Sequence, residues 1–283
     1  TQISGQISGQ TREPVRVCGA SLSTQALILS RWAQHLGRPL VVLVRNEEES
    51  LTLISDIEAI QSSLCGSLFS VFHLPTWDHS PYSSTLPSLR TRIQRVHVLS
   101  EALQQNLGGL PGPTIFVTQL AAFCQATLPP ELFHDAMIVL EPGRSMPRHT
   151  FIRLLLDSGY LQVDPVEDVG TFAIRGDIAD VFPPGFSQPL RIEFFDDHVE
   201  KVRPFDPVSQ RAFQKDGQKD GLSSSLLIPP AREVLIHSRT IPALREAIKT
   251  FADGVGISRK IRDPVLESIR EGTYPDHSDL WAP

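Results

Sequence analysis

The sequence has little cysteine, and the cysteine it has is not spaced for a cross-link or a metal. Its three cysteines are Cys18, Cys65 and Cys124, which lie far apart without a CxxC spacing. An odd number at such spacings argues against a disulfide framework, and the absence of a Cys/His cluster argues against a zinc site. We therefore expect all three to be buried thiols of a protein in a reducing cytoplasm.

Long apolar runs and a positive net charge are also missing. No run of about 18 apolar residues and no signal-peptide pattern occurs, so we expect no membrane segment. The net charge of −6 provides no general basic field for nucleic acid. This composition favours a protein partner over direct DNA binding, and we expect a monomer. The chain begins without methionine and stops abruptly at Pro283, so we expect a piece of a longer protein.

The motifs of common catalytic sites are absent as well. The nine histidines show no HExxH or other paired spacing for a metal, and no GxSxG nucleophile motif occurs. Carboxylates are frequent between Asp177 and Asp197, but the turns expected there explain them. The residues therefore suggest no enzyme site, no bound metal and no cofactor.

The first half of the sequence alternates between strand and helix patterns. Continuous apolar runs at 40–44 and 114–118 are typical of strands buried on both faces of a parallel sheet. Asn46 followed by three glutamates predicts a capped helix start, because acidic side chains suit the positive end of the helix dipole. The predicted fold class is α/β, with an α+β region after the change of pattern near residue 130.

A strand, a glycine turn and a helix near the N-terminus have the layout of a phosphate-binding P-loop. The strand is expected at 15–18 and the turn at Gly19. Thr24 stands where the motif has its second glycine, Gln25 where it has lysine, and Ala26 where it has the metal-binding hydroxyl. Without that charge and hydroxyl, nothing neutralises the β- and γ-phosphates, so we expect no ATP hydrolysis. On the residues alone, an ordinary strand–helix turn is the favoured explanation.

The second half is organised around residues 170–210, where apolar and polar residues alternate between breaks at Gly, Pro or Asp. This pattern predicts an antiparallel meander. The Asp-Asp pair at 196–197 falls where a tight hairpin needs residues that tolerate positive φ. Arg175 interrupts the first strand pair, and on the residues alone a surface ion pair with Asp177 or Asp180 explains it.

A resemblance to a known family is carried by FAIRGDIADVFPPG at 172–185 and PLRIEFFDDHVEKVRPFDPVSQR at 189–211. The chain resembles the N-terminal module shared by the bacterial excision-repair protein UvrB and the transcription-repair-coupling factors. FPPG, FFDD and FDPVSQR make it more similar to the coupling factors. The resemblance runs from about residue 15 to residue 283. It implies a degenerate P-loop, a RecA-like parallel sheet and an inserted α+β domain.

The resemblance implies that the chain divides into four parts. Residues 1–14 would be a flexible lead, and residues 15–122 the first part of the α/β domain. Residues 123–208 would form an α+β domain of the type that binds UvrA, and residues 209–283 would return to the α/β domain. UvrB has an aromatic hairpin that clamps damaged DNA, and the corresponding loop here is short. We expect its two aromatic residues, Trp77 and Tyr82, to pack this loop onto the domain.

The resemblance also implies a protein-binding surface. In UvrB the equivalent strand presents arginines to UvrA, and Arg175 matches one of them. Gln162 and Ala173 stand where other arginines would be. Phe172 and Tyr160 are expected to add apolar contact beside Arg175.

The implied function is that of a non-catalytic module of a transcription-repair-coupling factor, which recruits UvrA to damage at a stalled RNA polymerase. ATP and Mg²⁺ would belong only to the C-terminal motor of the longer parent, a DNA translocase, and other regions would bind the polymerase. Two alternatives stay open. One is an active UvrB-like helicase domain, which Gln25 and Ala26 argue against, and the other is an autoinhibitory domain that docks on the motor.

Overall fold

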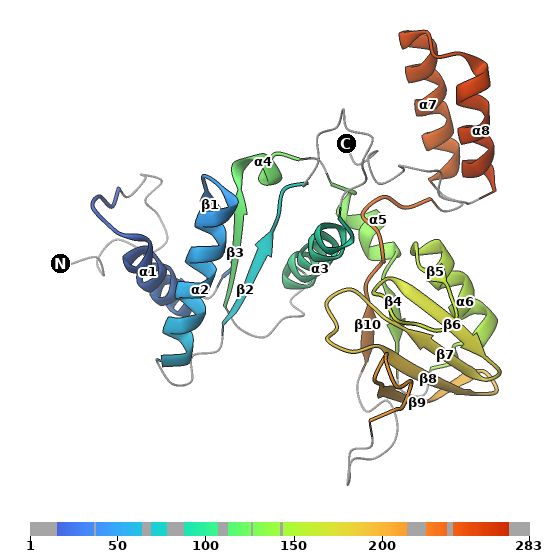
Figure 1. Ribbon diagram of the computed structural model, residues 1–283, viewed down its shortest axis with the longest axis horizontal. Coiled ribbons are helices and arrows are strands. Elements are labelled where there is room, and N and C mark those ends of the chain that lie inside the picture. The colour runs from blue at the N-terminus through green and yellow to red at the C-terminus, as the bar shows by residue number, and fades with distance from the viewer. Residues whose placement is uncertain are drawn as a thin grey trace.

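A computed structural model describes residues 16–36, 38–63, 69–77, 88–106, 113–125, 127–141, 144–213, 225–236 and 240–271 of the chain. Within these residues a parallel sheet lies near the N-terminus and a larger, mostly antiparallel sheet in the second half (Figure 1). The mixed α/β class predicted from the sequence is confirmed. No helix in the described part of the chain combines the length and apolar character that crossing a membrane requires.

The first sheet is parallel, with the strand order β1-β3-β2. Its strands are β1 (Leu40–Val44), β2 (Ser70–Leu74) and β3 (Thr114–Gln119). The helices around it are α1 (Leu22–Leu36), α2 (Glu47–Ser63), α3 (Leu89–Asn106) and the short α4 (Leu120–Phe123). Ala26 of α1, Leu53 of α2 and Ile115 of β3 share one core, so α1 and α2 cover one face of the sheet. Helix α3 lies on the other side (Figure 1).

The start of α2 follows from its sequence. The backbone N–H of Glu49 donates to Asn46 Oδ1 at 2.8 Å, as expected for an N-cap residue. The Glu49 carboxylate also accepts hydrogen bonds from the Arg45 guanidinium, and this contact lowers the pKa of Glu49. The predicted cap and the predicted acidic first turn are both confirmed.

The second sheet is a five-stranded meander with the order β5-β6-β7-β8-β9. Its strands are β5 (Leu161–Gln162), β6 (Thr171–Arg175), β7 (Ile178–Val181), β8 (Leu190–Phe195) and β9 (His198–Pro204). All neighbours are antiparallel except β5 and β6, which run parallel. Asp196 lies in the β8–β9 turn at φ 52°, which confirms the prediction of a tight hairpin that needs positive φ.

One face of the meander packs on a hydrophobic core. The elements on this side are β4 (Ile138–Leu140), α6 (Arg148–Asp157) and β10 (Leu226–Ile228), whereas α5 (Pro130–Asp135) packs through Phe133 against Val96 of α3. Phe172 of β6 and Ile192 of β8 meet Phe151 and Leu155 of α6 in this core. Strand β10 pairs antiparallel with β4, so the chain returns to this unit after residue 225. The opposite face of the sheet carries the polar side chains described below.

The last described elements form a helical hairpin. Helices α7 (Ile241–Val255) and α8 (Arg259–Arg270) pack on each other, and Figure 1 shows them standing away from the parallel sheet. Gly256 ends α7 in the left-handed conformation at φ 73°, a common way for a helix to stop. The link to the first unit comes earlier, at Glu233, which pairs with Arg95 of α3.

Two sequence-based expectations differ from the structure. The strand expected at 15–18 is absent over its described part, because residues 16–18 pair with no neighbouring strand. Cys18 and Cys124 are exposed and not buried, since one precedes the Gly19 turn and the other follows the end of α4. Cys65 and the aromatic Tyr82 lie outside the described residues. Trp77 is described and is half-buried under Arg95, whose guanidinium carbon lies 4.5 Å from the ring centre.

Candidate functional site

The outer face of the meander is an ordered polar surface, set by the period-two alternation of its strands. Ala173, Asp180, Arg191 and Arg203 lie opposite one another across β6 to β9. The next row is formed in the same way by Arg175, Ile178, Glu193 and Lys201. Phe172 and Ile174 project to the other face, into the core. The sheet therefore carries acidic and basic side chains on one face over a rigid apolar base.

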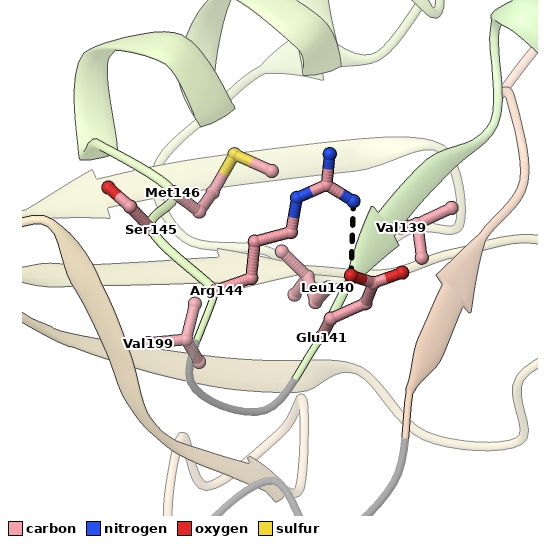
Figure 2. A pocket seen from close by; sticks show the side chains of 7 residues that line it. All are labelled: Val139, Leu140, Glu141, Arg144, Ser145, Met146 and Val199. Carbon is pink, nitrogen blue, oxygen red and sulfur yellow. Dashed lines mark hydrogen bonds and ion pairs between the residues drawn. The ribbon is translucent and has the colours of Figure 1, made fainter.

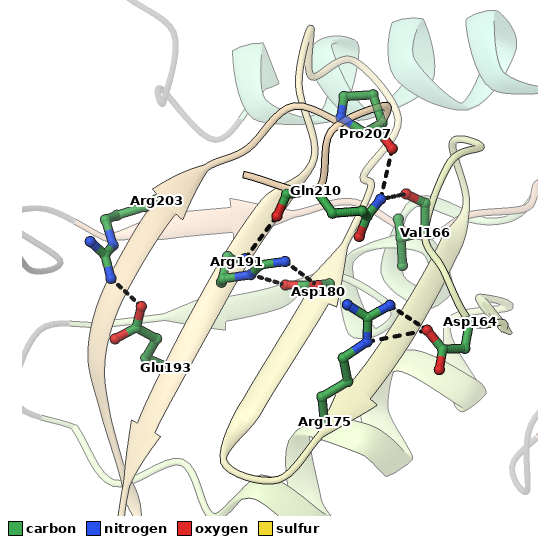
Figure 3. A network of polar contacts seen from close by, with 9 residues as sticks. All are labelled: Asp164, Val166, Arg175, Asp180, Arg191, Glu193, Arg203, Pro207 and Gln210. Carbon is green, nitrogen blue, oxygen red and sulfur yellow. Dashed lines mark hydrogen bonds and ion pairs between the residues drawn. The ribbon is translucent and has the colours of Figure 1, made fainter. Parts of the chain in front are cut away.

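Arg191 and Asp180 form the best-ordered pair on this surface (Figure 3). Arg191 Nε and Nη2 donate to the two oxygens of Asp180 at 2.7 and 2.8 Å. The Asp180 side chain is almost fully buried, and the Arg191 guanidinium lies 4.7 Å from the centre of the Phe205 ring. The hydrogen bonds to Asp180 raise the pKa of Arg191. Both charges are committed within the fold, so this pair stabilises the surface and leaves little charge for a ligand.

Arg175 occupies the exposed end of the same surface. Its Nε and Nη2 both donate to one oxygen, Oδ1 of Asp164, and the Nε contact measures 3.1 Å. The Arg175 side chain is 41% exposed and that of Asp164 is 70% exposed. Arg203 pairs with Glu193 on the neighbouring strands, and that pair is less exposed. An exposed ion pair is worth about 0–1 kcal/mol, so a competing carboxylate can displace Asp164 at little cost.

The ion-pair partners suggested by the sequence are occupied elsewhere. Asp180 is held by Arg191, and Asp177 lies 3.6 Å from Arg148 of α6. Arg175 pairs instead with Asp164, eleven residues back in the chain and beyond the end of β5. The sequence did not predict the roles of Asp164 and Arg191, because pairing across strands has no short-range sequence signal.

The structure divides the sequence-predicted surface residues into two groups. Gln162 is exposed on β5, and Arg175 is exposed at the end of β6. Phe172, Ala173 and Tyr160 are 0%, 2% and 3% exposed, respectively. The expected apolar contact of Phe172 and Tyr160 with a partner is thereby corrected: Phe172 belongs to the core, and the Tyr160 hydroxyl donates to the carbonyl of Pro229 at 2.6 Å.

The glycine turn near the N-terminus is closed on itself. Gly19 has φ 75°, and the Gln25 side chain donates to the carbonyl of Ala20 at 3.0 Å. The hydroxyls of Ser21 and Thr24 are 2.9 Å apart, and the backbone N–H of Thr24 donates to Ser21 Oγ. Ala26 is fully buried against the sheet. Ser21 thus acts as a helix cap at the place where a P-loop would bind a phosphate.

A small depression lies at the edge of the α+β unit (Figure 2). Its seven lining residues are Val139, Leu140, Glu141, Arg144, Ser145, Met146 and Val199. Arg144 and Glu141 form an ion pair across it at 3.0 Å, and it has no enclosed space for a small molecule. Among the described residues, no three His, Cys, Asp or Glu side chains are grouped to hold a metal ion. The polar face is therefore the stronger candidate site.

Comparison with known proteins gives two kinds of match. Residues 138–220 match the UvrB interaction domain, a span that contains β4 to β9 and the polar face. Over 91% of its length the chain is 33% identical to 21% of the transcription-repair-coupling factor of Myxococcus xanthus. Over 98% of its length it is 25% identical to 22% of that of Escherichia coli (strain K12). The coupling factor of Staphylococcus aureus (strain MRSA252) is also 25% identical, over 97% of this chain and 22% of its own. The chain thus spans about a fifth of the length of these relatives.

Proposed function

We propose that this chain is a UvrA-recruiting module, because residues 138–220 match the UvrB interaction domain and nearly the whole chain is similar to part of the transcription-repair-coupling factors. In this proposal the polar face of the meander binds UvrA and so connects transcription with excision repair. The observation that carries it is Arg175, an exposed guanidinium at the end of a rigid strand inside the matched region.

The chemistry of Arg175 supports a carboxylate on the partner. A guanidinium presents a planar fork that can hold a carboxylate through two hydrogen bonds, and arginine is enriched among residues that dominate binding energy. Its present partner, Asp164, is exposed and contributes one oxygen. The core beneath β6 fixes the backbone of Arg175, so little ordering is needed when a partner binds.

We further propose that this chain does not hydrolyse ATP. The parallel sheet is interpreted as the remnant of a RecA-like domain whose P-loop has degenerated. Support comes from Gln25 and Ala26 at the lysine and hydroxyl positions, and from the Gln25 side chain folded back onto Ala20. In the longer relatives, other regions would then provide an ATP-driven motor and the contact with RNA polymerase. Docking of this module on the motor would be a property of the whole protein.

The binding proposal is tested with a charge reversal and a matched control. Arg175→Glu is compared with Arg153→Glu on α6, because Arg153 is also exposed and ion-paired but lies on the opposite side of the unit. Affinity for purified UvrA is measured by surface plasmon resonance, with thermal unfolding as a check on the fold. We expect Arg175→Glu to weaken binding about tenfold or more and Arg153→Glu to leave it unchanged.

A second variant tests the role of the guanidinium fork. Arg175→Lys keeps the charge and removes the bidentate geometry, so we expect an affinity between those of the wild type and Arg175→Glu. UvrA binding by a folded Arg175→Glu variant at the wild-type affinity would overturn the role given to Arg175, and a wild-type chain that does not bind UvrA would overturn the proposed function.

A further inference from the structure

The turn at residues 206–211, which follows β9, displays an apolar side chain at its tip. Val208 is 90% exposed, more than any other large apolar side chain among the described residues. A single exposed valine is ordinary on a protein surface and by itself implies nothing. The unusual feature is the number of contacts that hold this turn in place.

The Asp206 carboxylate organises the tip of the turn. It accepts hydrogen bonds from the backbone N–H groups of Val208 and Ser209, both at 3.2 Å, and from the Ser209 hydroxyl at 2.6 Å. These bonds lower the pKa of Asp206, with the Ser209 hydroxyl as the largest cause. The backbone N–H of Gln210 adds a bond to the carbonyl of Asp206 at 2.8 Å. The backbone on either side of Val208 is therefore fixed.

A second set of contacts fastens the turn to the polar face. The Gln210 side chain donates to the carbonyls of Pro207 and Val166 at 2.7 and 3.1 Å, and Arg191 Nη1 donates to the carbonyl of Gln210 at 3.2 Å (Figure 3). The same Arg191 binds Asp180 on β7. The turn and the sheet are thus one hydrogen-bonded unit.

The hydrogen-bonded contacts of this turn extend to Arg175. Val166 lies two residues beyond Asp164, the partner of Arg175, so the segment at 163–166 joins the two ends (Figure 3). Val163, Val166, Ala173 and Phe205 pack in one apolar cluster on this side of the sheet. Arg211, the last residue of the turn, is also exposed. Val208 therefore belongs to the same hydrogen-bonded surface as Arg175.

We propose that Val208 is the apolar anchor of the surface on which Arg175 provides the charged contact. The partner it fits is a protein with an apolar socket rimmed by carboxylates, which meet Arg175 and Arg211. The inference rests on the proposed function and takes that same protein, UvrA, as the partner. Since the turn is ordered before binding, burying Val208 gains apolar contact without the entropy cost of fixing a loop.

The test replaces Val208 with glutamine and uses Leu156→Gln as the control. Leu156 is another exposed apolar residue, but it lies on α6, on the other side of the sheet. With the 283-residue chain and purified UvrA, we expect Val208→Gln to weaken binding by about tenfold, and Leu156→Gln to leave it unchanged. Val208→Thr, which keeps the β-branched shape and replaces one methyl group with a hydroxyl, decides the question if the glutamine variant unfolds. We expect Val208→Thr also to weaken binding.

Each outcome separates this inference from the proposed function. Weak binding by both Arg175→Glu and the Val208 variants supports a combined surface. Weak binding by Arg175→Glu with wild-type binding by folded Val208 variants overturns the anchor and leaves the proposed function intact. Weak binding by the Val208 variants with wild-type binding by Arg175→Glu supports the anchor and overturns the role given to Arg175.

Asp206→Ala, which releases the turn while keeping Val208, is expected to lower affinity as well; an unchanged affinity would contradict the role of pre-ordering.

Discussion

Arg95 and Glu233 lie 138 residues apart in the sequence and form a buried, doubly hydrogen-bonded ion pair, with both contacts at 2.9 Å. The Arg95 side chain is fully buried, and its Nη1 also donates to the carbonyl of Pro75 and to Gln125 Oε1. Trp77 covers the guanidinium plane. One arginine on α3 therefore connects the residues that follow β2 and α4 with the segment that follows β10.

The first prediction concerns this pair. Glu233→Ala leaves the Arg95 guanidinium buried without a counter-charge, and we expect a loss of about 3–5 kcal/mol in the free energy of unfolding. Urea denaturation measures the loss. The double variant Arg95→Met/Glu233→Leu removes both charges and should recover a large part of it. A loss below about 1 kcal/mol in Glu233→Ala would contradict the structural role of the pair.

A second prediction uses two glycines with different surroundings. Gly185 has φ 82°, and a Cβ there would overlap the ring of His97 on α3. Gly176 has φ 60°, but a Cβ there would meet nothing within 4 Å. We expect Gly176→Ala to cost about 1–2 kcal/mol for its backbone conformation alone, and Gly185→Ala to cost about 2–4 kcal/mol because overlap is added. Thermal or urea unfolding distinguishes the two.

The overlap can be separated from the backbone strain. In Gly185→Ala/His97→Ala the ring is gone, so the alanine at 185 should then cost about as much as the alanine at 176. If the cost at 185 is the same with and without His97, the turn at 183–185 does not press against α3 as the structure shows.

The third prediction is a loss of stability in mild acid. Burial lowers the pKa of His97 and of His73 below the ordinary histidine value of about 6.5. The unfolded chain therefore binds protons first as pH falls through about 6.5, and stability decreases from there downward. Glu101, 3.8 Å from His97, has a pKa raised by burial, which opposes this trend at the acid end.

Unfolding free energies between pH 7.5 and pH 5 check this expectation. His97→Gln removes one of the two groups, so its stability should fall less steeply over that range than that of the wild type. Equal slopes for the two proteins would show that His97 does not titrate differently in the folded and unfolded states.

How far the sequence predicted the structure depends on how local each signal is. The Asn46 cap, the apolar strands and the Asp196 hairpin are set by neighbouring residues, and they were predicted. The pairing of Arg175 with Asp164 depends on how β5 lies beside β6, which no pattern of a few residues encodes.

The burial of Phe172, which was expected to contact a partner, could have been predicted from the sequence. Phe172 and Arg175 are three positions apart on one strand, so alternation places their side chains on opposite faces. If the charged Arg175 faces solvent, this alternation turns Phe172 toward the buried face of the sheet. It would therefore have assigned Phe172 to the core, where it is found. The exposed Val208 had no such signal, because its display depends on the contacts of Asp206 and Gln210 within the folded turn.

The fourth prediction separates burial from binding at Tyr160. The Tyr160 hydroxyl is buried and donates to the carbonyl of Pro229 at 2.6 Å, and burial raises its pKa well above the usual value of about 10. Tyr160→Phe removes that bond and leaves the carbonyl without its donor, so we expect a loss of about 1–2 kcal/mol in unfolding free energy at pH 7.

The pH dependence and the binding of Tyr160→Phe complete this test. A tyrosine whose folded pKa is raised contributes stability below about pH 10 that is lost as pH rises, since the unfolded chain ionises first. The phenylalanine variant should therefore lose less stability than the wild type between pH 9 and pH 11. Because the ring faces the core, its affinity for UvrA should equal that of the wild type. Loss of UvrA binding in a folded Tyr160→Phe variant would show instead that Tyr160 contributes to binding. The binding site would then lie nearer to β5 than the exposure of Arg175 indicates.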